Sequence, residues 1–324
     1  MPFRPTAAML APVSRIPLII DCDPGIDDAV ALFLAFAAPD ALELLAVTTV
    51  AGNVSADQTA RNARMLRQIA AREDVPVYAG AQGPLVREPV EAGHFHGETG
   101  LGDLALFEPD EPVAPGHAAQ AIVDLVMARP AGAVSLVVIG PMTNVALAMA
   151  LEPAIVPRLG RIVAMGGARR EGGNITASSE YNIHADPHAA HKVIGSGVPI
   201  MLLGLDATHQ VRATQARIAA IRALGTEPAL AMAQILDFSV RVEKVLVGWD
   251  APPVHDPCTV AYLLAPELFV TRPAKVDVEM ASLITLGHTA VEFRLQDPAA
   301  ATVHWATEID HEGFFALLLE RLAP

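Results

Sequence analysis

Lysine is scarce in this sequence, and acidic residues outnumber basic ones. Only three of the 22 basic residues are lysines, and the formal net charge is −14. A surface of this charge repels the phosphates of nucleic acids and the headgroups of anionic membranes. We therefore expect no nucleic-acid partner and no membrane partner.

Cysteines are few and long apolar runs are missing. Cys22 and Cys258 are too few for a disulfide framework and suit a reducing compartment, so we expect a cytoplasmic protein with both thiols packed inside. No uncharged apolar run approaches the roughly 18–20 residues of a membrane span. Residues 1–15 hold a short apolar patch broken by prolines, which indicates a loose N-terminal segment rather than a signal peptide.

Apolar residues, by contrast, make up 52% of the 324 residues, enough to bury the large core of a single domain, 1–324. Continuous apolar runs predict buried strands at 16–20, 42–50, 133–140, 161–167 and 198–206. Helical patterns lie at 27–37, 55–72, 117–128, 143–151 and 186–195. This alternation predicts a doubly wound α/β fold, a mostly parallel sheet with helices on both faces. Ser55 and Gln58 fit a capping box at the second helix.

Four aspartates, at positions 21, 23, 27 and 28, crowd into eight positions after the first strand. Asp27 and Asp28 could simply complement the dipole of the following helix. Asp21 and Asp23 are different, because they end a buried strand and no Lys or Arg follows them before Arg61. Carboxylates without a His or Cys cluster favour Ca²⁺ or Mg²⁺. The pattern therefore favours a metal site over simple capping.

Further polar stretches follow other expected strands, where doubly wound sheets bind their ligands. Asn53 follows the second strand, and His255 and Asp256 precede an apolar helix pattern. The stretch 174–187 is typical of a surface loop when taken alone, although its amide and carboxylate groups would suit a polyhydroxylated ligand. We expect the segments near 80–105 and 207–255 to be insertions that cover the site.

Together these segments resemble the inosine–uridine-preferring nucleoside hydrolases, which cleave the N-glycosidic bond of ribonucleosides. The resemblance runs from about residue 16 to the C-terminus. Its elements are DCDPGIDDAVAL, TTVAGN, HGETGLG, GPMTN, MGG, NITASSEYNIHADP, LGLDATHQ and VHDPC. It implies a Rossmann-like nucleoside hydrolase fold, calcium-dependent release of ribose and free base, a role in nucleoside salvage, and a homodimer or homotetramer.

Carried over residue by residue, the resemblance implies a role for each polar cluster. Ca²⁺ would be bound by Asp23, Asp28, Asp256 and a backbone carbonyl, that of Ile139 with Thr143 nearby. Asp23 would be the general base toward a metal-bound water, and His255, with a near-neutral pKa, the leaving-group acid. The substrate-binding residues would be Asp27 and Asn182 at the 2′-hydroxyl, Asn53 near the 3′-hydroxyl, Asn174 and Glu180 at the 5′-hydroxyl, Met165 against the ribose, and His96 from a loop. Asp21 would orient the other carboxylates.

The base preference stays open at this level. Purine-handling relatives often supply tyrosines before the HDP element, whereas this chain has Phe238 and Trp249 there. Arg241 and Glu243 could reach the base edge, although a solvated helix face is the more typical interpretation.

Two alternatives remain. One is a phosphatase that uses an aspartate at a strand end, but Pro-Gly follows Asp23 where a phosphate-cradling pair is expected. The other is a nucleoside-binding module without catalysis, against which the joint presence of Asp23, Asp28, His255 and Asp256 argues.

Overall fold

The computed structural model of the protein describes residues 15–90 and 93–324. Residues 1–14, which make up nearly all of the expected loose N-terminal segment 1–15, lie outside the described residues. Within the described part, no helix is both long enough and apolar enough to cross a membrane.

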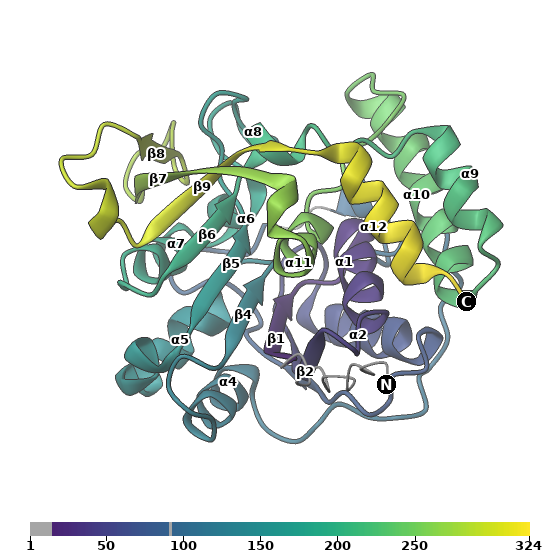
Figure 1. The fold of residues 1–324 in the computed structure, drawn as a ribbon, viewed down its shortest axis with the longest axis horizontal. Helices are drawn as coiled ribbons and strands as arrows, with labels where there is room; N and C mark the ends of the chain where they lie inside the picture. Colours follow the sequence, from purple (N-terminus) through teal and green to yellow (C-terminus); the bar gives the residue numbers. More distant parts are fainter. Residues whose placement is uncertain (1–14, 91–92) are drawn as a thin grey trace, which may run out of the picture.

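A nine-stranded sheet forms the centre of the described chain, in the order β3-β2-β1-β4-β5-β6-β9-β7-β8 (Figure 1). The strands are β1 (Ile16–Cys22), β2 (Leu42–Thr49), β3 (Val77–Ala79), β4 (Ser135–Val138), β5 (Arg161–Met165), β6 (Ile200–Leu203), β7 (Phe269–Val278), β8 (Thr289–Glu292) and β9 (Val303–Ile309). Neighbouring strands from β3 to β9 pair in parallel. β7 pairs antiparallel with both β9 and β8, so the sheet is mostly parallel.

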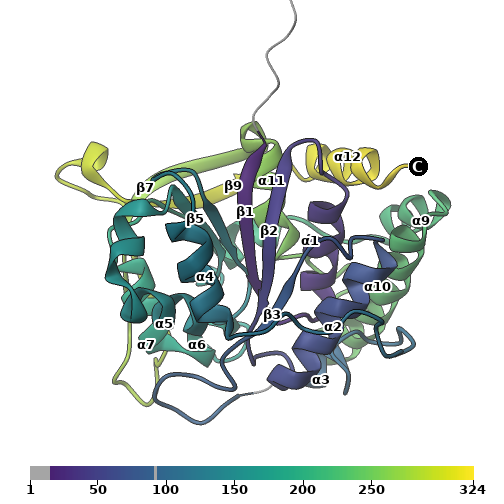
Figure 2. The same ribbon diagram turned by 90° about the horizontal axis from the view of Figure 1, so that it is seen from below.

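Helices cover both faces of the sheet (Figure 2). The α-helices are α1 (Ile26–Phe36), α2 (Ala56–Ile69), α3 (Gly93–His96), α4 (Ala118–Met127), α5 (Thr143–Leu151), α6 (Tyr181–Ala185), α7 (Pro187–Ile194), α8 (Leu205–Thr208), α9 (Gln215–Ala223), α10 (Glu227–Leu246), α11 (Pro257–Leu264) and α12 (His311–Leu322). Short 3₁₀ helices lie at Pro153–Arg158, Pro266–Leu268 and Pro298–Ala300. One core contains residues of α1, α2 and α9 to α12, and a second contains residues of α4, α5 and α7.

Strand β1 shows why helices cover both faces of the sheet. Leu18 and Ile20 belong to the core on the α1 side, whereas Ile19 belongs to the core on the α4 side. All three are fully buried, as the continuous apolar run predicted. The sequence-based prediction of a doubly wound α/β fold is therefore confirmed.

The five predicted strands and five predicted helices are present, with small shifts at their ends. Strands β3, β7, β8 and β9 were not predicted. The capping box was wrong: no hydrogen bond from the Ser55 side chain caps α2, and Nε2 of Gln58 donates to Oδ1 of Asn62 instead. The segments near 80–105 and 207–255 both contribute residues to a cavity, among them His96 and Glu243, and the second also contains the helices α9 and α10.

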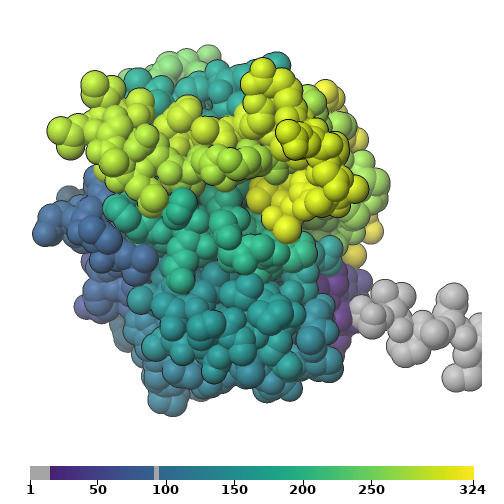
Figure 3. Space-filling view, turned by 90° about the vertical axis from the view of Figure 1, so that its left-hand side faces the viewer, coloured from purple at the N-terminus to yellow at the C-terminus, as the bar shows by residue number. Residues whose placement is uncertain are grey.

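The strand order reverses between β1 and β4, which creates a crevice at their carboxyl ends. Asp21 pairs in register with Val138, so the aspartates after β1 lie beside the residues that follow β4. The expected ligand position is therefore the carboxyl end of β1 and β4. On another side of the molecule, the yellow-green C-terminal segment that contains β7 and β8 forms a band above the teal surface (Figure 3).

Candidate active site

A cavity of about 340 Å³ lies at this end of the sheet. Ten of the thirteen site residues predicted from the sequence line it: Asp27, Asn53, His96, Ile139, Met165, Asn174, Glu180, Asn182, His255 and Asp256. The other three, Asp21, Asp23 and Asp28, are fully buried. The volume lies in the range of small-molecule sites.

The turn between β1 and α1 is held by the side chain of Asp28. Its Oδ1 accepts from the amide of Asp23 at 3.1 Å, and its Oδ2 accepts from the amide of Gly25 at 3.0 Å. The second bond satisfies the amide of Gly25, the N-cap residue of α1, and the first ties the end of β1 to this helix. A Cβ at Gly25 would lie 2.5 Å from Nδ1 of His96 and 2.6 Å from Nδ2 of Asn53, so this approach requires glycine. His96 closes the turn by accepting from the amide of Ile26 at 3.0 Å.

Backbone groups pack closely around the carboxylate of Asp23. Its Oδ2 accepts from the amide of Asn53 at 2.8 Å. Cβ atoms added at Gly52 and Gly140 would lie 2.1 Å and 2.6 Å from its carboxylate oxygens, so both neighbours must be glycine. Among the described residues, the buried Oδ1 of Asp23 has no hydrogen-bond partner. A buried oxygen in this state indicates a missing ligand.

Three carboxylates meet at the floor of the cavity. One oxygen from each of Asp27, Asp28 and Asp256 lies within 4.8 Å of the others. Asp28 and Asp256 belong to the predicted metal-binding set, whereas Asp27 was predicted to bind ribose and Asp23 lies outside this triplet. These oxygens are the donors that hard divalent cations prefer.

Burial and mutual repulsion raise the pKa values of these groups. Burial, then the charge of Asp27, raises the pKa of Asp28 to about 7. Burial followed by the charges of Asp27, Asp28 and Asp23 holds the pKa of Asp256 well above its usual range. The pKa of Asp23 is raised by burial and then by Asp28. A bound divalent cation would relieve this repulsion, so the donor set fits such an ion.

Asp21 lies behind the cavity. Its Oδ1 accepts from Oγ1 of Thr48 at 2.6 Å and from Nδ2 of Asn144 at 2.8 Å. Burial raises its pKa to about 7. The same Asn144 amide donates to the carbonyl of Thr49 at 2.9 Å, so Asp21 ties the ends of β1 and β2 to the start of α5.

The wall opposite the aspartates is built around α6. Glu180 caps this helix by accepting from the amides of Asn182 at 2.9 Å and Ile183 at 3.2 Å, and it also accepts from Gly167 at 3.0 Å. Burial raises the pKa of Glu180 to about 7. Nδ2 of Asn182 donates to the carbonyl of Ile139 at 2.9 Å, which brings together two residues predicted to share the site.

Asn174 also belongs to this wall, and its Oδ1 accepts from the amide of Tyr181 at 2.9 Å. Asn182 in addition donates to the carbonyl of Met165 at 3.3 Å. The stretch 174–187, typical of a surface loop by composition, is therefore ordered around the cavity by its own side chains.

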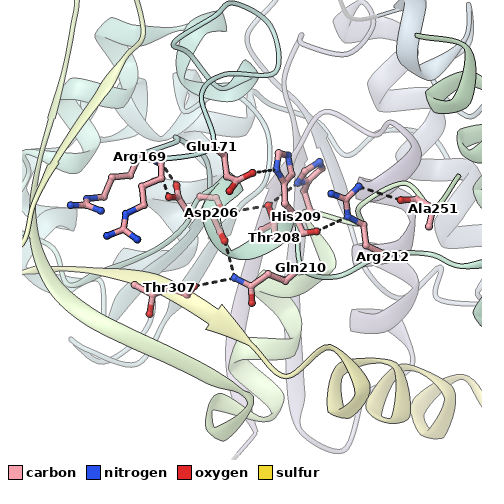
Figure 4. A network of polar contacts seen from close by, with 12 residues as sticks. Arg169, Glu171, Asp206, Thr208, His209, Gln210, Arg212, Ala251 and Thr307 are labelled. Atoms are coloured by element: carbon pink, nitrogen blue, oxygen red, sulfur yellow. Dashed lines mark hydrogen bonds and ion pairs between the residues drawn. The ribbon is translucent and has the colours of Figure 1, made fainter. Parts of the chain in front are cut away.

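His255 is held by α8. Its Nδ1 lies 2.7 Å from Oγ1 of Thr208, and its ring centroid lies 5.6 Å from that of His209. His209 in turn pairs with Glu171 at 3.0 Å (Figure 4). The near-neutral pKa expected from the sequence is wrong here, because burial lowers the pKa of His255 to about 4. In the absence of ligands its ring is neutral at pH 7.

The outer wall of the cavity contains residues that the sequence did not single out as site residues, among them Glu171, His209 and Ser239. Trp249, weighed only as an aromatic before the HDP element, also lines it, packing edge-on against His209 at 5.2 Å and lying 4.0 Å below the guanidinium of Arg212. His209 lies in the LGLDATHQ element, whereas none of the quoted elements contains Glu171 or Ser239.

Helix α10 carries three side chains whose roles the sequence left open, and the structure shows where each one lies. Glu243 lines the cavity, and burial followed by the charge of Asp27 raises its pKa to about 7. Arg241 instead pairs with Asp103. A Cβ at Gly102 would lie 2.6 Å from the ring of Phe238, so Phe238 packs against the segment that follows α3.

Comparisons with known proteins identify the family of this chain. The family model described as inosine-uridine preferring nucleoside hydrolase matches residues 18–316. The inosine-uridine preferring nucleoside hydrolase of Leishmania major is 42% identical over 307 residues, covering 94% of this chain and 96% of its own. The pyrimidine-specific ribonucleoside hydrolase RihA of Enterobacter sp. (strain 638) is 42% identical over 309 residues, covering 95% and 98%.

Among solved structures, a purine-preferring ribonucleoside hydrolase from Gardnerella vaginalis matches with a TM-score of 0.88 at 30% identity, covering 94% of this chain and 98% of its own. The family match over nearly the whole chain, the relatives above 40% identity and the shared fold lead to one assignment. This chain belongs to the inosine-uridine preferring nucleoside hydrolases, enzymes that hydrolyse the N-glycosidic bond of ribonucleosides.

Proposed function

We propose that this protein releases ribose and free base from ribonucleosides in a calcium-dependent reaction, with Asp23 as the general base and His255 at the leaving base. The observation that carries the proposal is the unpaired, buried Oδ1 of Asp23 within the described chain, next to three clustered carboxylates. A cation and a water provide the partners that this oxygen requires.

The proposed ligands of Ca²⁺ are Asp23, Asp28, Asp256 and the carbonyl of Ile139. Asp27 is the alternative to Asp23, because its carboxylate belongs to the 4.8 Å cluster. An ion held by these residues would act as a Lewis acid that makes a nearby water more acidic. Oxygen donors without histidine or cysteine favour Ca²⁺ or Mg²⁺ over Zn²⁺, and the family resemblance favours Ca²⁺.

Asp23 takes the proton of the attacking water. The amide of Asn53 holds Oδ2 of Asp23 at 2.8 Å, which leaves Oδ1 to accept that proton. Burial raises the pKa of Asp23 in the metal-free protein. A cation at the proposed site would lower this pKa again and favour the ionised carboxylate.

The acidic lining suits a ribose that develops positive charge. Cleavage of an N-glycosidic bond passes through an oxocarbenium-like state, which nearby carboxylates stabilise. We assign Asp27 and Asn182 to the 2′-hydroxyl and Asn53 to the region of the 3′-hydroxyl. Asn174 and Glu180 would meet the 5′-hydroxyl, Met165 would pack on the sugar, and His96 would contact substrate from its loop. Asp21 supports this floor through Thr48 and Asn144.

The outer wall sets the base preference. The names of the relatives described above include inosine-uridine, pyrimidine and purine preferences, so membership of the family does not decide between bases. In this chain Glu243 and Trp249 line the outer cavity together with His255. A carboxylate there accepts hydrogen bonds from N–H groups on the base edge.

We further propose that the enzyme is a cytoplasmic homodimer or homotetramer in nucleoside salvage. Both cysteines are buried free thiols, which is compatible with a reducing compartment.

Ribose release from inosine, adenosine, guanosine, uridine and cytidine, with and without a calcium chelator, tests the proposed function. Chelator-sensitive release supports it. Stoichiometric nucleoside binding without release would favour the binding module, and phosphate release from a phosphomonoester would favour the phosphatase. Readdition of Ca²⁺ or Mg²⁺ after chelation identifies the ion.

A further inference from the structure

The ring of His255 is fixed from one edge by Thr208. Nδ1 lies 2.7 Å from the Thr208 hydroxyl, while the ring lines the cavity and remains partly exposed. With Nδ1 occupied, Nε2 is the ring nitrogen available to a ligand in the cavity. Which nitrogen carries the proton is set by the bond that the other nitrogen makes.

The Thr208 hydroxyl has a second partner, the carbonyl of Gly204 at 3.3 Å. A hydroxyl donates one hydrogen bond and can accept others. When Nδ1 is bare, Thr208 donates to it. When Nδ1 is protonated, Thr208 accepts from it and donates to Gly204. In the first arrangement the neutral ring carries its proton on Nε2; in the second, Nε2 carries a proton only when the ring is charged.

We propose that Thr208 is a positioning residue that fixes the ring of His255 through Nδ1 and so keeps Nε2 turned toward the cavity. This inference deepens the proposed function and rests on it. From the charged ring, Nε2 gives its proton to the nitrogen of the departing base, which takes the electron pair of the glycosidic bond. The neutral ring keeps its other proton on Nδ1, hydrogen-bonded to Thr208. A ring that is neutral from the start donates an Nε2–H hydrogen bond to the base.

The surroundings hold Thr208 in place. The residue is fully buried, and a β-branched side chain has few χ1 options. Gly204 packs so closely on Trp305 that a Cβ would lie 2.3 Å from the indole. Asp206 accepts from the amides of Arg169 at 2.7 Å and Arg170 at 2.8 Å, which anchors α8 between its neighbours (Figure 4).

Replacing the hydroxyl by a methyl group tests the proposal. Thr208→Val should lower kcat for inosine or uridine about 10- to 100-fold with little change in KM, because the proton donor is misplaced. The same variant should lose less than about 3-fold on 4-nitrophenyl riboside, whose leaving group needs no proton. Thr208→Ser keeps the hydroxyl and should restore most of the lost rate.

A matched control is Thr59→Val, because Thr59 is also fully buried and its hydroxyl donates to a backbone carbonyl, that of Ala56, at 2.9 Å. Melting temperatures of all variants show whether a loss comes from unfolding. Equal losses on the nucleoside and the aryl riboside, or no loss on either, would overturn the role of Thr208. So would a further loss when Thr208→Val is added to His255→Ala.

The hydrogen bond at Nδ1 gives a readout that needs no turnover. In ¹⁵N-histidine spectra, with His255→Ala for assignment, the Nδ1 signal of His255 should shift in Thr208→Val and stay close to its wild-type position in Thr208→Ser. An Nδ1 signal that is the same in all three proteins would contradict the inference. Absence of nucleoside turnover by the wild type would instead count against the proposed function, while the Nδ1 signal would still test Thr208.

Discussion

Asn53 donates two hydrogen bonds to Asp23. The Asn53 amide donates to Oδ2 of Asp23 at 2.8 Å, and Nδ2 of Asn53 donates to the Asp23 carbonyl at 3.1 Å. The same Nδ2 reaches Oδ2 of Asp28 at 3.1 Å. The backbone amide of Asn53 thus fixes which carboxylate oxygen of Asp23 is left for chemistry, while its side chain ties Asp23 to Asp28.

Asp23→Asn should reduce ribose release by about 100-fold or more, because the variant loses the general base and a proposed metal ligand. The fold should persist, since the new side-chain oxygen can still accept from Asn53. Ribose release and thermal melting check this. Asp57→Asn, at an exposed position in the first turn of α2, is the control. Activity close to wild type in Asp23→Asn would remove Asp23 from the mechanism.

His255→Ala should slow the release of poor leaving groups far more than that of an activated aryl riboside, because only the former need a proton. The measurement is kcat/KM on uridine or inosine against 4-nitrophenyl riboside. If both substrates lose the same factor, His255 does not act at the leaving base.

In the metal-free protein, the melting temperature should rise as the pH falls from 8 to 6.5. Burial raises the pKa of Asp21, Asp28 and Glu180 to about 7, so near pH 7 the folded state binds more protons than the unfolded state, whose carboxyls titrate near 4. Lowering the pH through 7 therefore stabilises the fold, by an amount on the order of a few °C.

Below pH 6.5, His255 opposes this trend. Burial lowers its pKa from 6.5 to about 4, so between these pH values the unfolded chain binds a proton that the folded chain does not bind, and this destabilises the fold. Saturating Ca²⁺ should reverse the trend between pH 8 and 6.5, because its carboxylate ligands must be ionised. Melting curves in chelator and in Ca²⁺ test both statements; a melting temperature in chelator that falls over this window would refute the first.

Glu243→Gln should change the ranking of nucleosides by about 10-fold in relative kcat/KM, since an acceptor on the outer wall becomes a mixed donor and acceptor. Its effect on 4-nitrophenyl riboside should be small. Arg241→Gln is the matched control, because Arg241 lies on the same helix but pairs with Asp103. An unchanged ranking in Glu243→Gln would place the base elsewhere in the cavity.

The sequence predicted the central strands because continuous apolar runs have few alternatives to burial in a parallel sheet. Strand β7 escaped this reasoning, since it is not a continuous apolar run: buried and exposed residues alternate from Ala274 to Val278, and Pro273 lies within the strand. β7 is held by antiparallel pairing with β9 and β8 at the edge of the sheet, which no local pattern encodes.

The parts of the site that come from residues close together in the sequence were predictable. Asp21, Asp23, Asp27 and Asp28 crowd around the end of one strand, and this crowding favoured a metal site over simple capping. Glu243 was only an open possibility, because the packing of α10 against α1 brings it to the cavity. The low pKa of His255 was also hidden, since it depends on burial by distant segments.

Glu180 combines two functions that an engineer would prefer to separate. It lines the cavity and also holds the amides of Gly167, Asn182 and Ile183, so replacing it to admit a different sugar would loosen the wall itself. Glu243 faces the cavity from the side of a long helix that its own hydrogen bonds stabilise. New substrate scope should therefore be sought in the base rather than in the sugar.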